Sequence, residues 1–168
     1  MPVKFQDFSI EVEAVLDETT IAWLNETARS IASEASDKCT MNRSTDGIAL
    51  DQSYDSKVDD DKGEAQIGSP LEAAFWEEWG TGEYAAHGDG RKGWWVYVKD
   101  GPTGDGGKTY ATEDEAKAVA TRMRREGLEA YHTNGRKPNY TLEHAFDRVK
   151  NPAINRLKQL LRERTGSK

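Results

Sequence analysis

Two segments, one near each end of the chain, carry apolar residues at helical spacing. The first has an apolar stripe made of Ile21, Leu24, Ala28, Ile31, Ala32 and Ala35. The second has a stripe made of Leu142, Phe146, Val149, Ile154, Leu157 and Leu161. Such stripes bury one side of a helix against a core. We predict a helix from residue 18 to about 37 with Asp17 as its N-cap, and a final helix over 140–161 that Pro152 kinks or breaks.

Strand patterns lie between these helices and ahead of the first one. Residues 3–16 alternate apolar and polar side chains, which is typical of a half-buried strand. Residues 94–98 are all aromatic or β-branched, and these residue types favour strands. Two shorter strands are predicted over 48–54 and 65–69, with residues 55–64 as a hairpin end or loose loop that turns at Gly63.

Two shorter helices complete the prediction. One spans about 71–79, and the other runs from Glu113 to about Glu126, capped by Thr112 and ended by Gly127. The combined pattern predicts an α+β fold in which an antiparallel sheet of about four strands is packed by the N-terminal and C-terminal helices. The length of 168 residues fits a single domain.

The composition indicates a globular protein that also has surface for partners. Only 36% of the residues are hydrophobic and 32% are charged, although five Trp and six Tyr supply large buried areas. Cys39 is the only cysteine, which excludes an internal disulfide and a Cys-based metal site within the chain. The first ten residues lack the apolar core of a signal peptide, and no run approaches the roughly 20 apolar residues of a membrane span. We therefore expect a reducing, cytoplasmic setting.

Charge is divided unevenly along the chain. Residues 1–119 contain 11 Lys and Arg against 25 Asp and Glu, a net charge of −14. Residues 120–168 contain 12 Lys and Arg against 5 Asp and Glu, a net charge of +7. The two parts could attract each other within one subunit or between neighbouring subunits. They could equally be two solvated faces that have no partner.

The sequence offers little support for catalysis. None of His87, His132 and His144 has another His or Cys at metal-ligand spacing. His87 could pair with Glu77 or Glu78, but these adjacent glutamates should point in different directions. The Gly-rich segments 80–82 and 88–92 complete neither a P-loop nor a dinucleotide-binding motif. We therefore predict a protein that is not an enzyme and that has no cofactor or metal.

A basic C-terminal segment raises nucleic-acid binding as an alternative. Three arginines lie on the predicted helix over 113–126, namely Arg122, Arg124 and Arg125. The last helix carries a basic face made of Arg148, Lys150, Arg156, Lys158, Arg162 and Arg164. Such clusters attract phosphate groups. The chain as a whole is acidic and has no helix-turn-helix or other reading module, so direct DNA contact is not expected.

Two short motifs carry a resemblance to a known family. The first is an aromatic and acidic run that leads into a Gly-Thr-Gly turn, formed by Trp76, Glu78, Trp79, Gly80, Thr81 and Gly82. The second, some 50 residues later, opens the last helix and includes Gly135, Pro138, Tyr140, Ala145 and Phe146. Together these motifs, and the order of elements from residue 21 to 161, resemble the tail-component family of tailed bacteriophages. This family comprises small head–tail joining and tail-completion proteins of the virion neck.

The resemblance implies a structural role. A member would form a homo-oligomeric ring, expected to be a hexamer, that completes the tail or joins it to the head connector. Its other partners would be phage connector or head-completion proteins and tail-tube proteins. It would be assembled in the host cytoplasm and end in the virion neck or tail. The motif residues would shape the fold or form a subunit interface.

The chain departs from the family pattern in two segments. After the first helix, the family often has a Pro-x-x-Thr-Gly turn, and here residues 39–47 keep only Thr45-Asp46-Gly47. The loop and helix over 99–128 resemble an insertion that many members lack. We therefore expect one domain over residues 1–168 that contains this insertion.

Overall fold

The computed structural model describes residues 18–41, 44–45, 48–99 and 106–165. The strand predicted over 3–16 and its following cap, Asp17, lie outside these residues. The chain divides into two compact units. The first unit comprises residues 1–78 and 139–168, and the second comprises residues 79–138.

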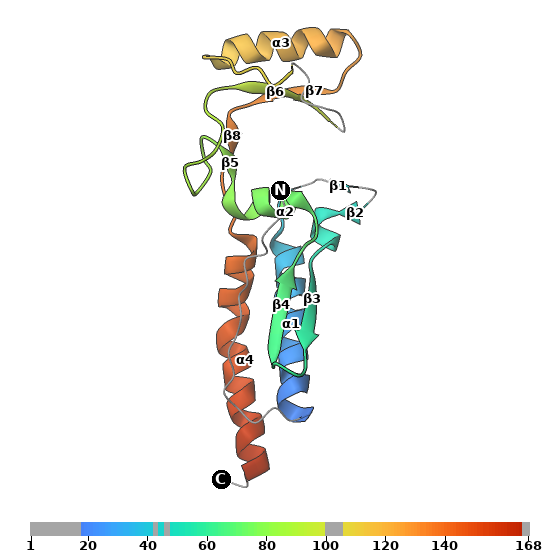
Figure 1. The fold of residues 1–168 in the computed structure, drawn as a ribbon, viewed down its shortest axis with the longest axis vertical. Coiled ribbons are helices and arrows are strands. Elements are labelled where there is room, and N and C mark those ends of the chain that lie inside the picture. Colours follow the sequence, from blue (N-terminus) through green and yellow to red (C-terminus); the bar gives the residue numbers. More distant parts are fainter. Residues whose placement is uncertain (1–17, 42–43, 46–47, 100–105, 166–168) are drawn as a thin grey trace. The chain divides into compact units, whose positions relative to one another are not determined.

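The first unit is organised around two long helices and a β-hairpin (Figure 1). Its helices are α1 (Glu18–Lys38), α2 (Glu72–Trp79, whose last residue falls in the second unit) and α4 (Thr141–Thr165). Its remaining elements are β1 (Ser44–Thr45), β2 (Ile48–Ala49), the 3-10 helix η1 (Leu50–Gln52), β3 (Asp55–Asp59) and β4 (Glu64–Gly68). The strand predicted over 48–54 is therefore replaced by the short strand β2 and a 3-10 turn.

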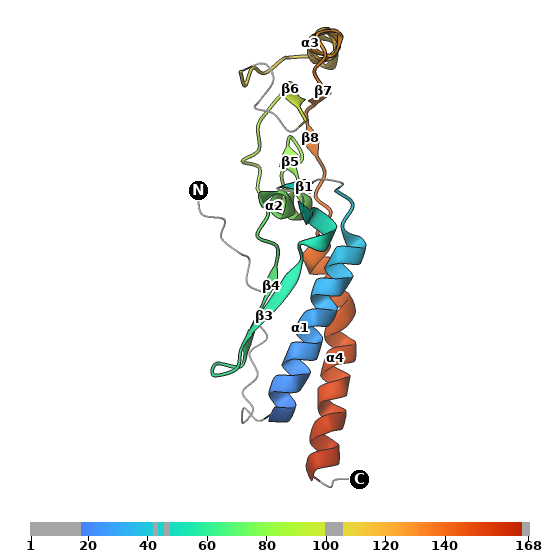
Figure 2. The same cartoon turned by 90° about the vertical axis from the view of Figure 1, so that its right-hand side faces the viewer.

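Helices α1 and α4 pack side by side (Figures 1 and 2). The indole Nε1 of Trp23 donates a 2.8 Å hydrogen bond to the carbonyl of Ala153, and both residues are buried. Arg148 and Glu34 form a 3.0 Å ion pair between the same helices. Helix α4 continues through Pro152, so the predicted break does not occur. A proline removes one backbone donor, and this packing holds both halves of the helix on α1.

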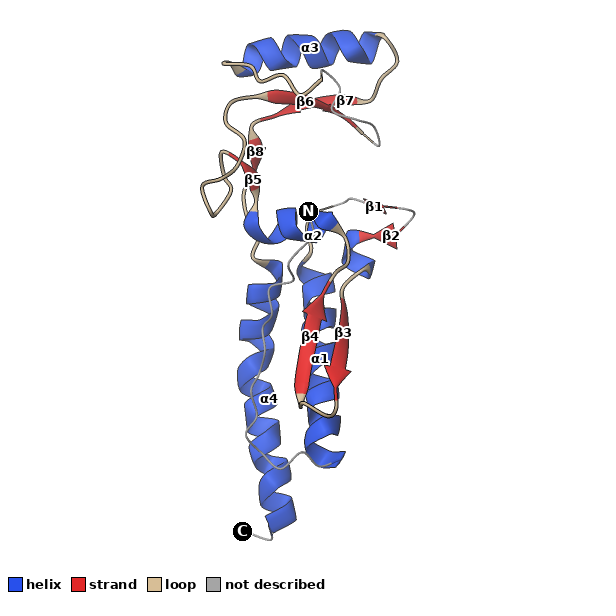
Figure 3. Ribbon diagram, in the orientation of Figure 1, coloured by secondary structure: helices blue, strands red, loops and turns tan. Residues whose placement is uncertain are grey.

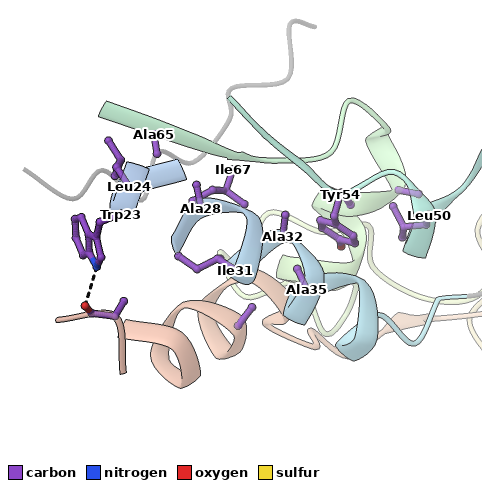
Figure 4. Packing of buried hydrophobic residues seen from close by; sticks show 14 residues of the cluster. Trp23, Leu24, Ala28, Ile31, Ala32, Ala35, Leu50, Tyr54, Ala65 and Ile67 are labelled. Carbon is purple, nitrogen blue, oxygen red and sulfur yellow. Dashed lines mark hydrogen bonds between the residues drawn. The ribbon is translucent and has the colours of Figure 1, made fainter. Parts of the chain in front are cut away.

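The hairpin β3–β4 packs on α1, and the main core lies between them and α4 (Figure 4). The two strands are antiparallel, with Ser56 opposite Ile67 and Val58 opposite Ala65. Of the two alternatives predicted for residues 55–64, the hairpin is therefore confirmed and the loose loop is wrong, since residues 55–59 form a strand. The charged side chains of Asp55, Lys57 and Asp59 alternate with Ser56 and Val58, so only half of the strand needed to be apolar. The buried core residues are Trp23, Leu24, Ala28, Ile31, Ala32, Ala35, Leu50, Tyr54, Ala65, Ile67, Ala73, Ala74, Ala145 and Ala153.

In the second unit, the described residues form short strands and one helix (Figure 3). Its elements are β5 (Thr81–Gly82), β6 (Trp95–Val98), α3 (Glu113–Arg125), β7 (Ala130–Thr133) and β8 (Gly135–Arg136). Helix α3 packs on the antiparallel pair β6–β7 around a small core of Val96, Ala116, Ala120, Met123 and Ala130. The predicted cap is confirmed, because the Thr112 hydroxyl accepts a hydrogen bond from the Glu115 N–H.

The fold is α+β, as predicted, but its sheets are small. The strands pair two by two and antiparallel, as β1–β2, β3–β4, β5–β8 and β6–β7, rather than in one sheet of about four strands. All of these strands are between two and five residues long, so each strand offers few backbone groups for pairing with a further strand. The segment 99–128, predicted to be an insertion, falls inside the second unit.

Candidate functional site

The two motif segments are brought together by backbone pairing. In the second unit, β5 and β8 align Thr81 with Arg136 and Gly82 with Gly135. The Thr81 hydroxyl also accepts a 3.0 Å hydrogen bond from the Arg136 N–H. Residues separated by more than 50 positions in the sequence are therefore neighbours in space.

A second set of contacts joins the motifs within the first unit. The last carbonyls of α2 accept backbone hydrogen bonds from the segment that precedes α4. Asn139 N–H donates to the Glu77 carbonyl at 2.8 Å, and Tyr140 N–H donates to the Glu78 carbonyl at 3.3 Å. The chain passes into the second unit after Glu78 and returns before Asn139. The outgoing and the returning segments are thus hydrogen-bonded to each other within the first unit and again within the second unit.

The carboxylate of Glu78 caps the N-terminus of α4. One oxygen accepts the Leu142 N–H at 2.7 Å and the other accepts the Glu143 N–H at 3.2 Å. The first backbone N–H groups of a helix have no partner inside the helix, so an acceptor from elsewhere satisfies them. The Glu78 side chain is buried. It therefore fixes where α4 starts relative to α2.

Glu77 joins α2 to the end of α1 and to the start of α4. Its Oε1 accepts hydrogen bonds from the Thr40 N–H at 2.7 Å, the Thr40 hydroxyl at 2.9 Å and the Asn139 side-chain amide at 2.8 Å. The Thr141 hydroxyl lies 3.4 Å from the same oxygen. Glu77 is fully buried, and a buried carboxylate needs such partners. The neighbouring glutamates thus serve different contacts within one buried polar cluster.

The surroundings of this cluster shift two pKa values. Burial raises the pKa of the Glu78 carboxyl above its usual range, and the N–H groups of Leu142 and Glu143 oppose that rise. Burial also raises the pKa of the Tyr54 hydroxyl far above its usual range, and the nearby Cys39, Glu77 and Glu78 add to this effect. Tyr54 therefore stays neutral beside the two glutamates.

Gly80 sits at a close approach between the two motif segments. Its φ is +70°, a conformation that non-glycine residues rarely adopt. A Cβ atom at this position would lie 2.6 Å from the Arg136 carbonyl oxygen and 2.8 Å from the Pro138 nitrogen. Both are backbone atoms, which cannot move aside alone. A glycine is therefore required both by the backbone conformation and by the available space.

The other motif residues take up several roles. Trp76 and Phe146 are half-buried and pack against the core of the first unit. Trp79 lies against the His87 ring in the second unit, with ring centroids 4.7 Å apart. Tyr140 has a φ of +48°, which is uncommon for a tyrosine, and its carbonyl accepts the His144 N–H at 2.9 Å. These residues shape the two units, and their predicted role in a subunit interface remains a prediction.

The basic residues of α4 lie mainly on its exposed side. Arg148 pairs with Glu34, and the Lys150 ammonium lies 5.7 Å from the Phe146 ring centroid. Arg156, Lys158 and Arg162 are exposed, and the side chain of Arg164 lies outside the described residues. Apart from the pairing of Arg148 with α1, this side of the helix is compatible with binding an acidic partner.

The site shows a fixed set of structural hydrogen bonds. The Glu77 and Glu78 carboxylates accept hydrogen bonds from backbone and side-chain donors of the first unit, while His87 is exposed and packs on Trp79. Among the residues that the structure describes, no group of three or more His, Cys, Asp or Glu side chains could hold a metal ion. Both carboxylates thus take part in hydrogen bonds that position the helices of the first unit.

Sequence reasoning did not identify the buried cluster. It considered Glu77 and Glu78 as possible partners of His87 and named Glu78 as a motif residue, but it did not single out Thr40, Asn139 or Thr141. One signal was present, because two adjacent glutamates stand in the otherwise apolar run Ala73-Ala74-Phe75-Trp76-Glu77-Glu78-Trp79. Buried charges at such positions need distant partners, but the sequence does not identify them.

No family model matches the chain, and neither a curated protein nor a solved structure shows significant similarity to it. In the part of the chain that the structure describes, each helix is too short or too polar to cross a membrane.

Proposed function

We propose that the chain is a structural virion protein of a tailed phage or prophage. It forms a homo-oligomeric ring, a hexamer, at the head–tail interface, where it completes the tail or joins it to the head connector. The observation that carries this proposal is the pairing of the two motif segments on which the resemblance to tail-component proteins rests. Thr81 pairs with Arg136, and Glu78 caps α4 just after Tyr140.

This pairing supports the proposal because it gives both motifs one physical purpose. Short Gly-containing motifs occur by chance, but two that interlock across more than 50 residues act as a single structural element. The cluster uses its polar groups to hold helices, which suits a protein that works by presenting surfaces. Several large apolar side chains are left in water, including Phe75, Tyr97, Leu128 and Tyr131. Exposed apolar groups of this kind are candidates for contact with other subunits.

The virion itself provides the direct test. Particles released from a host that carries the gene would be purified on a density gradient and analysed by quantitative mass spectrometry. We expect the chain in intact particles at a few copies per particle, and we expect a deletion to yield separate heads and tails. Absence of the chain from intact, infectious particles would refute the proposal. Neighbouring genes for portal, capsid and tail-tube proteins would add support.

Binding to nucleic acid through α4 is the second candidate function. The exposed Lys150, Arg156 and Lys158 favour it, because phosphate contacts need accessible cations. Titration of random duplex DNA at several salt concentrations separates the two functions. Nucleic-acid binding predicts affinity that falls steeply with salt and that is lost on Arg156→Glu/Lys158→Glu. The assembly role predicts weak binding that these substitutions barely change.

A further inference from the structure

Asn134 and Gly135 form the one Asn-Gly sequence of the chain. Asparagine is a thermolabile residue. It is most reactive before glycine, because a glycine has no side chain to hinder the attack of its own backbone nitrogen on the asparagine side chain. Asn134 directly precedes β8, and Gly135 is paired with Gly82 of β5. This reactive sequence therefore lies inside the contact that joins the two motif segments.

The side chain of Asn134 is bound to Glu83. Its amide nitrogen Nδ2 donates a 3.3 Å hydrogen bond to Glu83 Oε2. The Asn134 carbonyl also accepts a 2.9 Å hydrogen bond from the Glu83 N–H, so the two residues are joined through both backbone and side chain. The other Glu83 oxygen accepts the Gly93 N–H at 3.2 Å, which positions the carboxylate. The amide of Asn134 is therefore held by an acceptor that is itself fixed.

The backbone nitrogen of Gly135 is also engaged in the folded chain. Its N–H donates a 3.0 Å hydrogen bond to the Thr133 hydroxyl, and this hydroxyl donates to the Gly135 carbonyl at 3.1 Å. The backbone of β5 packs closely on Gly135, since an added Cβ atom there would lie 2.9 Å from the Gly82 Cα. Attack on the Asn134 side chain requires this nitrogen to leave Thr133 and the backbone to rotate. The closed junction opposes both changes.

We propose that Asn134–Gly135 is a deamidation site that the closed β5–β8 junction protects and that an opened junction exposes. In the reaction, hydroxide takes the proton of the Gly135 N–H and the nitrogen attacks Asn134 Cγ. A new C–N bond forms, the bond from Cγ to Nδ2 breaks, and ammonia leaves with a proton from water. Water then opens the succinimide ring at either carbonyl and gives aspartate or isoaspartate. This inference goes beyond the proposed function and does not depend on it.

The product would be incompatible with the closed junction. A carboxylate at position 134 replaces a donor with an acceptor and faces the Glu83 carboxylate, so like charges meet where the 3.3 Å hydrogen bond stood. Isoaspartate also adds a methylene group to the backbone next to Gly135, which shifts β8 against β5. Deamidation would therefore make an opening of the junction permanent.

The rates of deamidation in the folded and the unfolded chain test the protection directly. The wild type would be incubated at mildly alkaline pH, once in buffer and once in guanidinium chloride at the same pH and temperature. Peptide mapping by mass spectrometry would measure aspartate and isoaspartate at position 134. We expect the folded chain to react at least about tenfold more slowly, because its reaction waits for local opening. Equal rates would overturn the proposal.

Two variants and a matched control identify the protecting contacts. Glu83→Ala removes the acceptor of the Asn134 amide, and Thr133→Val removes the acceptor of the Gly135 N–H. Each should deamidate several times faster than the wild type while circular dichroism shows that it is folded. Glu126→Ala, which removes an exposed glutamate of the same unit, should react at the wild-type rate. If both test variants are folded and react no faster than the control, the proposal is wrong.

An exchange of partners tests the effect of the product on the junction. Asn134→Asp should lower the thermal unfolding temperature, because it places two carboxylates side by side. Asn134→Asp/Glu83→Gln should recover most of this loss, because the new amide at position 83 again donates to the side chain at position 134. A double variant that is no more stable than Asn134→Asp alone would show that deamidation does not act through this contact, and it would overturn the proposal.

Discussion

Glu78 and Leu142 are joined by a 2.7 Å hydrogen bond although 64 positions separate them in the sequence. The bond links the end of α2 to the first turn of α4, and a second bond from the Glu143 N–H completes the cap. Because this cap fixes the start of α4 relative to α2, it also fixes Asn139 and Tyr140, which directly precede α4. The buried Glu78 side chain therefore contributes directly to the arrangement of α2 and α4 in the first unit.

Replacing Glu78 with alanine should destabilise the protein. The substitution leaves two backbone N–H groups of α4 without their acceptor and opens space in a buried site. We expect the free energy of unfolding to fall by about 1–3 kcal/mol. Urea denaturation followed by tryptophan fluorescence measures this change. Asp147→Ala, on the exposed side of α4, is the control and should cost little; an equal loss in both variants would contradict the capping role.

The raised pKa of Glu78 predicts a pH dependence with a definite sign. Because the pKa is higher in the folded state, folding favours the protonated carboxyl. The stabilising contribution of this group is therefore full below the pKa of the unfolded chain, about 4.3, and is lost as the pH rises through the folded-state value. As the pH rises from about 4 to 8, the wild type should lose stability relative to the Glu78→Gln variant, which has no carboxyl group to titrate at this position. A constant difference would show that burial does not raise this pKa.

Gly80 and Gly88 form a matched pair for testing the junction of the motif segments. Both have positive φ, +70° and +72°, but a Cβ at Gly88 would meet nothing within 4 Å. Gly88→Ala should cost only the conformational penalty, about 1 kcal/mol. Gly80→Ala adds a clash with the backbone at Arg136 and Pro138, and we expect a loss of more than about 2 kcal/mol. Thermal unfolding of both variants measures this difference in stability. Equal losses of stability would contradict the close approach described at Gly80.

Local sequence signals predicted the elements whose determinants are local. Helix α3 follows from Thr112 and its apolar stripe, and α1 follows from its own stripe. Strand β3 was missed because one side of it is charged, with Asp55, Lys57 and Asp59, and only Ser56 and Val58 face the core side. The continuity of α4 through Pro152 depends on packing against α1, including the bond from Trp23 to Ala153. The residues that keep α4 continuous therefore lie in a distant part of the chain, and the sequence around Pro152 does not identify them.

The candidate site was predicted in part. The motif residues were expected to shape the fold or to form a subunit interface, and the structure places two of them, Gly80 and Pro138, against each other. The buried roles of Glu77 and Glu78 could not be predicted, because their donors come from residues up to 65 positions away. A carboxylate inside an apolar helix signals that partners exist, and only the fold identifies them as Thr40, Asn139 and the first turn of α4.

The mass of the protein in solution tests the central claim most directly. Native mass spectrometry and light scattering over a hundredfold range of concentration would be compared with the chain mass of 18.8 kDa. The ring proposal predicts a closed species of about six chain masses that grows at the expense of the monomer and does not extend further. A single species of one chain mass across the whole range would contradict it.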